Sequence, residues 1–252
     1  MQYRSGPEAA QGKELSMKRI RDWSDWAGFT VFTFLWVLAL ANNPGVGVMM
    51  APLVLHPLLS SVGFLLRKPL ISSAPGFLPR LAGYGATFGV LACYGVFQAF
   101  HPEWLAPTSS PRIKAAGVAI WLLGAALDLW TLWCLRHGMS IVPQARTLIT
   151  GGPYRYARHP LYTAYIVQNI GLWLRMATFP MALVLFGWFV ITLVRVRHEE
   201  DVLSRTFPAY ETYRGAVGMF TPRLANSRSQ PPAAQPQPED QKRERKAEIA
   251  AA

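Results

Sequence analysis

Twelve residues in the second half of the chain read GGPYRYARHPLY (Gly151–Tyr162) and interrupt a sequence that is otherwise mostly apolar. Two glycines open this stretch, arginines and a histidine follow, and Pro160 leads into an apolar run. Arginine side chains present a planar fork that binds carboxylates and phosphates. The stretch therefore predicts one wall of a binding site for a charged small molecule, held at a membrane surface.

The apolar segments around this stretch predict a membrane protein. The chain is 51% hydrophobic and 15% charged, against about 25% charged residues in an ordinary soluble domain. No Lys, Arg, Asp or Glu occurs between residues 27 and 66. We expect apolar helices over residues 27–41, 46–66, 81–100, 113–135, 161–174 and 181–196.

The last two segments predict a helical hairpin. Residues 161–174 are too few to cross a hydrocarbon core of about 30 Å at about 1.5 Å per residue, and Arg175 and Pro180 follow them. We therefore expect an all-α fold. It is a polytopic integral membrane helical bundle of five to six membrane segments, with the hairpin near its C-terminus.

Composition divides the chain into four parts. They are a polar leader (1–26), N-terminal membrane helices (27–112), a membrane core (113–224) and a disordered tail (225–252). The core contains a polar loop over 136–160 and a surface helix over 198–220. The surface helix is expected because Tyr210, Tyr213, Val217 and Phe220 recur at helical spacing. Gly85 and Gly89 have the small-xxx-small spacing that lets membrane helices approach closely.

Positive charge predicts the orientation in the membrane. The cations cluster in the loops after the second and fourth segments, whereas the turns near residues 43 and 175 hold none and one. By the positive-inside rule, both termini and the polar loop lie on the cytoplasmic side. The net charge of +11 is spread between apolar segments, so topology explains it better than binding to nucleic acid. We expect no metal site.

A second charged cluster follows the hairpin. Glu199 and Glu200 lie after the last apolar segment, on the same predicted membrane face as Arg155, Arg158 and His159. The hairpin joins the two clusters, so they can meet in space. Such walls of opposite charge match a ligand that has both an anionic and a cationic end.

At these positions the chain resembles the isoprenylcysteine carboxyl methyltransferase and phospholipid methyltransferase family. The shared motifs are Arg158-His159-Pro160-Leu161-Tyr162, the later Glu199-Glu200, Gly152-Pro153-Tyr154-Arg155-Tyr156, and Phe207-Pro208-Ala209-Tyr210 with Tyr213, Val217 and Pro222. The likeness covers roughly residues 113–224. Two positions depart from the family pattern, with Ala164 where glycine is frequent and Phe207-Pro208 in place of Phe-Gly.

The resemblance implies an enzyme that uses S-adenosylmethionine. Its cofactor-binding residues would be Gly152, Pro153, Tyr154, Arg158, His159, Pro160, Tyr162, Glu199 and Glu200. The methyl acceptor would be lipophilic and would enter from the bilayer as an isoprenylcysteine-like carboxylate, a phospholipid amine or another lipid. A carboxylate acceptor needs no general base, whereas an amine or a hydroxyl does.

No catalytic residue is assigned by the sequence. The candidates are Arg158, Glu200 and Asp128, the last because a carboxylate inside a membrane segment is costly. His56, Ser140 and Arg146 are weaker candidates. The oligomeric state stays open.

Two other functions remain alternatives. One is an NADPH-dependent sterol-type reductase, whose C-terminal region has a similar Arg-His-Pro and tyrosine pattern. Glu199-Glu200 and the lack of Asn after His159-Pro160 favour the methyltransferase. The other is a non-catalytic membrane protein or a transporter. Against it, the polar residues gather at one face instead of following a path through the midplane.

Overall fold

The computed structural model describes residues 23–42, 51–106 and 108–223, and these residues are mostly helical. The long helices are α2 (Trp23–Asn42), α3 (Ala51–Leu66), α4 (Phe77–Phe100), α5 (Pro111–Leu135), α6 (Pro160–Met176) and α7 (Phe179–Thr206), and α8 (Ala209–Ala216) is short. Two 3-10 turns, η1 (Pro102–Leu105) and η2 (Gly152–Arg155), accompany them. Strand β1 (Ser72–Ser73) pairs antiparallel with β2 (Gln144–Ala145). The expected disordered tail and most of the expected leader lie outside the described residues.

Two of the described helices, α5 and α7, are long and apolar enough to cross a membrane. Shorter apolar stretches lie in α2 (Trp26–Leu38) and in α3 (Ala51–Leu66). Large apolar side chains point outward from both long helices, since Leu123 of α5 is 68% exposed and Phe186 of α7 is 67% exposed. Such surfaces suit lipid better than water, and the expected total of five to six membrane segments stays a prediction.

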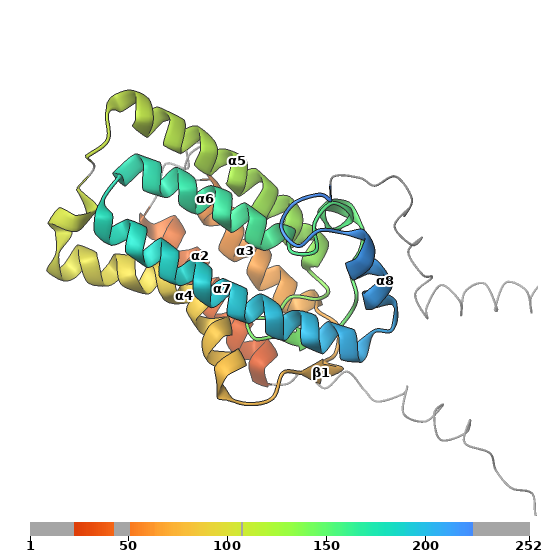
Figure 1. Ribbon diagram of the computed structural model, residues 1–252. Helices are drawn as coiled ribbons and strands as arrows, with labels where there is room; N and C mark the ends of the chain where they lie inside the picture. The colour runs from red at the N-terminus through yellow and green to blue at the C-terminus, as the bar shows by residue number, and fades with distance from the viewer. Residues whose placement is uncertain (1–22, 43–50, 107, 224–252) are drawn as a thin grey trace, which may run out of the picture.

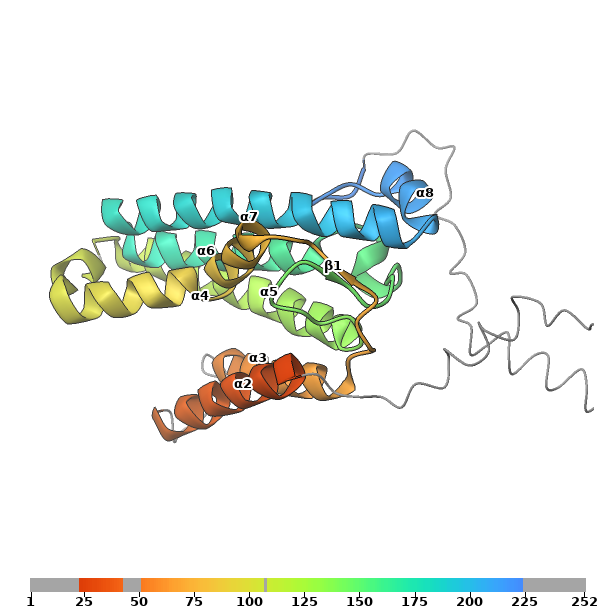
Figure 2. The ribbon, with the colours of Figure 1, turned by 90° about the horizontal axis from the view of Figure 1, so that it is seen from below.

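The helices form a bundle in which α5 is central. Helix α2 packs on α3, α3 on α5, α5 on α6, and α4 on α7. Figure 2 shows α2 and α3 together on the side of α5 that faces away from α7. A core of Phe32, Phe64, Leu132 and Met139 joins α2, α3 and α5 to the loop that follows α5.

Glycines bring α5 and α6 into backbone contact. A Cβ atom on Gly171 would lie 2.5 Å from the backbone nitrogen of Trp121, and one on Gly124 would lie 2.9 Å from the Ala164 carbonyl oxygen. Among the described residues, no helix backbone approaches Gly85 or Gly89 as closely as their small-xxx-small spacing led us to expect. A Cβ on Gly85 would meet only the side chain of Ile191, and one on Gly89 would meet nothing within 4 Å.

The expectation of one surface helix over residues 198–220 is wrong. Residues 198–206 continue α7, and the separate helix α8 covers only Ala209–Ala216. Phe207 is extended (φ −122°, ψ 106°) because the following Pro208 disfavours a helical conformation at the preceding residue. Val217 is extended too. The apolar face of this segment, with Tyr210, Tyr213 and Val217, is buried against Leu148, Leu203 and Phe207 of the protein itself.

Candidate functional site

The two predicted clusters meet at one end of the bundle. Figure 1 shows η2, the start of α6, the end of α7 and α8 gathered there. The backbone ties them together: the amide of Arg158 donates to the carbonyl oxygen of Gly218 (2.8 Å), and that of His159 donates to the carbonyl oxygen of Met219 (2.9 Å). The segment after α8 is therefore one support of the loop.

Gly152 and Pro153 give this loop its shape. Gly152 has φ +62°, a left-handed conformation that glycine adopts without cost, and a Cβ there would lie 2.8 Å from Sγ of Cys134. Pro153 is the second residue of the 3-10 turn η2, where a proline is favourable because its amide has no hydrogen to leave unpaired. The hydroxyl of Tyr213 donates to the Tyr154 carbonyl oxygen at 2.6 Å. Burial raises the pKa of Tyr213 above its ordinary range, so its hydroxyl stays protonated and can donate.

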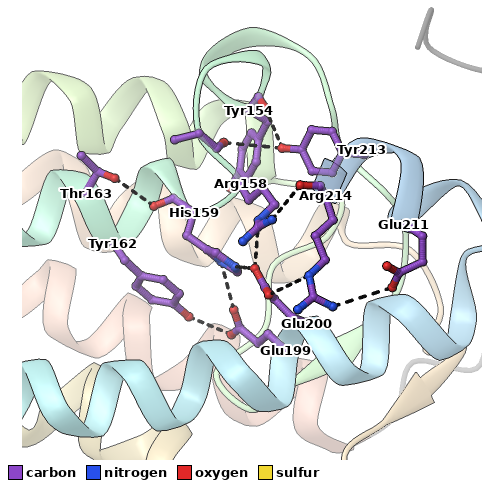
Figure 3. A network of polar contacts seen from close by, with 11 residues as sticks. Tyr154, Arg158, His159, Tyr162, Thr163, Glu199, Glu200, Glu211, Tyr213 and Arg214 are labelled. Carbon is purple, nitrogen blue, oxygen red and sulfur yellow. Dashed lines mark hydrogen bonds and ion pairs between the residues drawn. The ribbon is translucent and has the colours of Figure 1, made fainter. Parts of the chain in front are cut away.

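Glu200 is the carboxylate that fastens the loop to α7. Its Oε1 lies 3.0 Å from Nε of Arg158 and 3.1 Å from Nε2 of His159, and its Oε2 lies 3.6 Å from Nε of Arg214. The Arg158 contact is an ion pair without hydrogen-bond geometry. Figure 3 shows Arg158, His159 and Arg214 directed at this carboxylate. Because Glu200 is only 5% exposed, its charge is balanced by these protein side chains and not by solvent.

Glu199 has a different set of partners. Its Oε1 accepts hydrogen bonds from the hydroxyl of Tyr162 (2.7 Å) and from Nε of Arg195 (2.9 Å), and its Oε2 lies 3.8 Å from Nδ1 of His159. The Arg195 guanidinium also donates to the Ser140 carbonyl oxygen (3.0 Å) and to Oγ1 of Thr87 (2.9 Å). Arg195 thus connects α4, α7 and the loop after α5.

A pocket of about 110 Å³ lies beside these residues. Five of the predicted cofactor-binding residues line it: Tyr154, Arg158, His159, Tyr162 and Glu199. Further lining comes from Arg195, Tyr210, Tyr213 and the loop after α5. Four predicted residues, Gly152, Pro153, Pro160 and Glu200, are not among the lining residues. The contacts above give Gly152, Pro153 and Glu200 the role of shaping and holding the loop, and Pro160 begins α6.

The remaining candidates lie elsewhere. Asp128 lines a second cavity of about 460 Å³, where its Oδ2 lies 2.8 Å from Nδ1 of His56. Ser140 lines both cavities. Arg146 lines neither; its guanidinium donates to the Lys68 carbonyl oxygen (2.7 Å) and to Oε1 of Gln144 (3.2 Å).

Arg195 is the site residue that the sequence analysis missed. Its signal was present, because residues four apart on one helix face each other and Arg195 precedes Glu199 by four. The expected end of that helix at residue 196 concealed the pairing. Tyr210 and Tyr213 were recognised as one helix face but were expected to face the membrane surface.

Comparison with known proteins matches residues 113–209 to the phospholipid methyltransferase family. The nickel-cobalt-cadmium resistance protein NccN of Alcaligenes xylosoxydans xylosoxydans is 31% identical over 132 residues, which are 52% of this chain and 59% of NccN. The cobalt-zinc-cadmium resistance protein CzcN of Cupriavidus metallidurans is 30% identical over 127 residues, 50% of this chain and 56% of CzcN. The chain thus spans little more than half the length of these relatives. The family resemblance drawn from the motifs is confirmed.

Proposed function

Starting from the phospholipid methyltransferase domain over residues 113–209, we propose that this chain is a membrane-embedded methyltransferase that uses S-adenosylmethionine and a lipophilic acceptor. One observation carries the proposal. The pocket at the end of the apolar bundle has Glu199, Arg158 and His159 in its wall together with tyrosine rings. A ligand with charges of both signs and an aromatic base suits such a wall.

The residues present fit the chemical groups of this cofactor. Glu199 would bind its ammonium, since this carboxylate faces the pocket while Glu200 is enclosed. Arg158 and His159 would bind its carboxylate. The rings of Tyr154, Tyr162 and Tyr210 offer faces to the adenine and, through cation–π attraction, to the sulfonium. Burial raises the pKa of Tyr154, so no phenolate opposes an anionic ligand there.

The pocket must widen to admit such a ligand. Its volume of about 110 Å³ is below the roughly 300–1,000 Å³ usual for small-molecule sites. The wall that can give way is the loop after α5, where Gly138, Thr147 and Leu148 line the pocket from a segment without regular helix. The opposite wall is less free to move, because Glu200, Arg158 and Arg214 hold it.

The protein's part in the reaction is to align the two substrates and exclude water. S-adenosylmethionine supplies an electrophilic methyl group on its sulfonium. Arg195 and Tyr162 hold Glu199 in place, and both also line the larger cavity. An acceptor in that cavity would therefore meet the cofactor across the Tyr162–Arg195 wall. Cytoplasmic placement of the cofactor side follows from the positive-inside rule and is part of the proposal.

NccN and CzcN are named as metal resistance proteins. Within residues 23–42, 51–106 and 108–223, no three His, Cys, Asp or Glu side chains lie together as a metal site would need. The proposed acceptor is instead a lipid-like molecule, as the match to the phospholipid methyltransferase family supports.

The test is cofactor binding by the full chain in detergent, with S-adenosylmethionine and NADPH measured in parallel. We expect S-adenosylmethionine to bind, and Glu199→Gln to weaken it roughly 10-fold or more, because a charge-assisted hydrogen bond contributes about 1.5–3 kcal/mol. Glu103→Gln is the matched control, since Glu103 lies in η1 with its side chain 64% exposed. Thermal unfolding of each variant separates lost binding from lost folding.

Three results would contradict the proposal. NADPH binding without S-adenosylmethionine binding would favour the sterol-type reductase. Binding of neither would favour a non-catalytic membrane protein. If Glu199→Gln and the parent bound S-adenosylmethionine with equal affinity, Glu199 would not be a cofactor-binding residue.

A further inference from the structure

The second cavity is larger and mostly apolar. Its volume is about 460 Å³, within the range usual for small-molecule sites. It is an open cavity lined by α2, α3, α4, α5, α6, α7 and the loop after α5, with Phe32, Leu91 and Trp121 among its apolar lining. It adjoins the smaller pocket, since Tyr162 and Arg195 line both.

A buried carboxylate lies in the wall of this cavity. Asp128 is 3% exposed, and its Oδ2 lies 2.8 Å from Nδ1 of His56, on α3. In the described part of the chain, the other oxygen, Oδ1, is buried and has no hydrogen-bond partner. Such an unpaired polar atom costs about 1–3 kcal/mol, more when it is charged. An apolar pair could join α3 to α5 without that cost.

A second unsatisfied polar group lies in the wall of the same cavity. Nε2 of Gln168, also in the cavity wall, is buried without a partner among the described residues. Gln168 packs on Gly124, which is one helical turn before Asp128 on α5. His56, whose Nδ1 lies 2.8 Å from Asp128, also lines the cavity. In the described part of the chain, the cavity wall thus holds two buried polar atoms, Oδ1 of Asp128 and Nε2 of Gln168, that have no hydrogen-bond partner in the protein.

The charge of the wall selects between ligands. Of the Lys, Arg, Asp and Glu residues, Arg195 and Asp128 line the cavity. Nε of Arg195 lies 2.9 Å from Oε1 of Glu199, with which it forms an ion pair. No Lys or Arg of the lining therefore neutralises Asp128. An anionic group beside Oδ1 would be repelled in this poorly solvated place. A hydrogen-bond donor, neutral or cationic, would satisfy it.

We propose that Asp128 and His56 bind the polar end of the methyl acceptor in this cavity, and that this end is a hydrogen-bond donor such as a hydroxyl or an amine. An anionic carboxylate is disfavoured. The inference rests on the proposed methyltransferase function for the identity of the ligand as acceptor. The apolar walls hold its hydrocarbon part, and Asp128 and His56 determine specificity without a role in the methyl transfer step.

The test compares three probes with one hydrocarbon chain: dodecanol, dodecylamine and dodecanoate. Their binding to the full chain is measured by calorimetry in one detergent. We expect the alcohol, the amine or both to bind roughly 10-fold more tightly than the carboxylate. If both dodecanol and dodecylamine bind more tightly than dodecanoate, the site recognises any hydrogen-bond donor. If only dodecylamine does, the site recognises its positive charge. Partition into micelles is identical for all protein variants, so differences between variants report the protein.

The variants are Asp128→Asn and His56→Gln, with Glu103→Gln as control. Both cavity variants should reduce the preference over dodecanoate to less than about threefold, while the control keeps it. His56→Gln keeps the test usable if Asp128→Asn fails to fold, because the His56 side chain is 29% exposed and its replacement disturbs the core less. If the parent shows no preference, or if both variants unfold at lower temperature yet keep the preference, the pair only joins α3 to α5 and the inference is wrong.

S-adenosylmethionine binding by the same preparations separates the two proposals. Cofactor binding without any preference among the probes refutes the specificity site alone. A probe preference that depends on Asp128, in a protein that binds no cofactor, confirms the ligand site and refutes the methyltransferase proposal.

Discussion

Glu199 and Glu200 are neighbours in sequence but have different surroundings. Successive residues on an α-helix point about 100° apart, so one carboxylate faces the pocket and the other faces the loop and α8. Glu200 meets Arg158, His159 and Arg214, whereas Glu199 meets Tyr162 and Arg195. Glu199 therefore lines the pocket, whereas Glu200 holds the loop and α8 to α7.

We predict that Glu200→Gln lowers the free energy of unfolding by about 3 kcal/mol, because it leaves the Arg158 guanidinium largely buried without its counter-ion. Thermal unfolding in detergent measures this. Glu211→Gln is the matched control: Glu211 is also an ion-pair partner of Arg214, at 3.9 Å, but its side chain is 59% exposed. That variant should change stability by less than about 0.5 kcal/mol. Equal effects would show that burial of Glu200 does not matter.

Gly152 and Gly151 make a second matched pair. Gly152→Ala should cost about 1–2 kcal/mol, because an L-residue is disfavoured at φ +62° and its Cβ would meet Cys134. Gly151→Ala should be close to neutral, since φ is −92° and nothing lies within 4 Å of the added Cβ. Unfolding temperatures of the two variants give the comparison, and a stable Gly152→Ala protein would rule out the left-handed turn.

Helix α7 is the element that carries the carboxylates. It runs without interruption from Phe179 to Thr206, so Arg195 and Glu199 are fixed on one rigid helix face. Side chains on regular elements are held more precisely than those on loops. The loop after α5 lacks such regular structure over most of its length.

The contact between α5 and α6 depends on glycine. Gly171→Ala would place a Cβ 2.5 Å from the Trp121 backbone nitrogen and 2.6 Å from the Gly117 carbonyl oxygen. Backbone cannot yield as a side chain does, so we predict a loss of about 1–3 kcal/mol, measured by thermal unfolding in detergent. Gly187→Ala on α7 meets nothing within 4 Å and should keep or slightly raise stability. A neutral Gly171→Ala would mean that α5 and α6 lie farther apart.

At the scale of the molecule, the two ends of the bundle differ. Figure 1 shows α8 and the candidate site at one end, and η1 with the turn between α6 and α7 at the other. At that other end, Oγ of Ser109 donates to the Arg175 carbonyl oxygen (2.8 Å), and the amide of Thr108 donates to that of Met176 (3.0 Å). The arrangement suits a protein whose ends face different sides of a membrane.

Labelling from one side of the membrane tests this arrangement. In a variant without Cys93 and Cys134, Glu211→Cys should react with an impermeant maleimide only after the cells are opened, because the site end is predicted to be cytoplasmic. Glu103→Cys should react in intact cells. Both positions are exposed, with side-chain exposures of 59% and 64%. Labelling of both from one side would contradict the predicted topology.

The sequence by itself determined that the fold is mostly helical and that residues 113–209 resemble the phospholipid methyltransferase family, and it predicted five of the residues that line the pocket. Apolar runs of fixed length dictate helices in lipid, because backbone groups there must be paired internally. The motifs around Arg158-His159-Pro160 and Glu199-Glu200 stood out in the sequence because charged residues are rare and costly inside apolar runs. The bounds of α5 and α6 differ by only a few residues from those expected.

The tertiary structure alone decided which carboxylate lines the pocket, where the backbones meet and which cavity Asp128 lines. Residues 198–206 were expected to belong to a separate surface helix, but they continue α7, where Glu199 and Glu200 form ion pairs with Arg195 and Arg158. Asp128 and His56 stand 72 positions apart, and no local pattern links them. Partners far apart in sequence are chosen by packing, which a one-dimensional pattern of polarity does not contain.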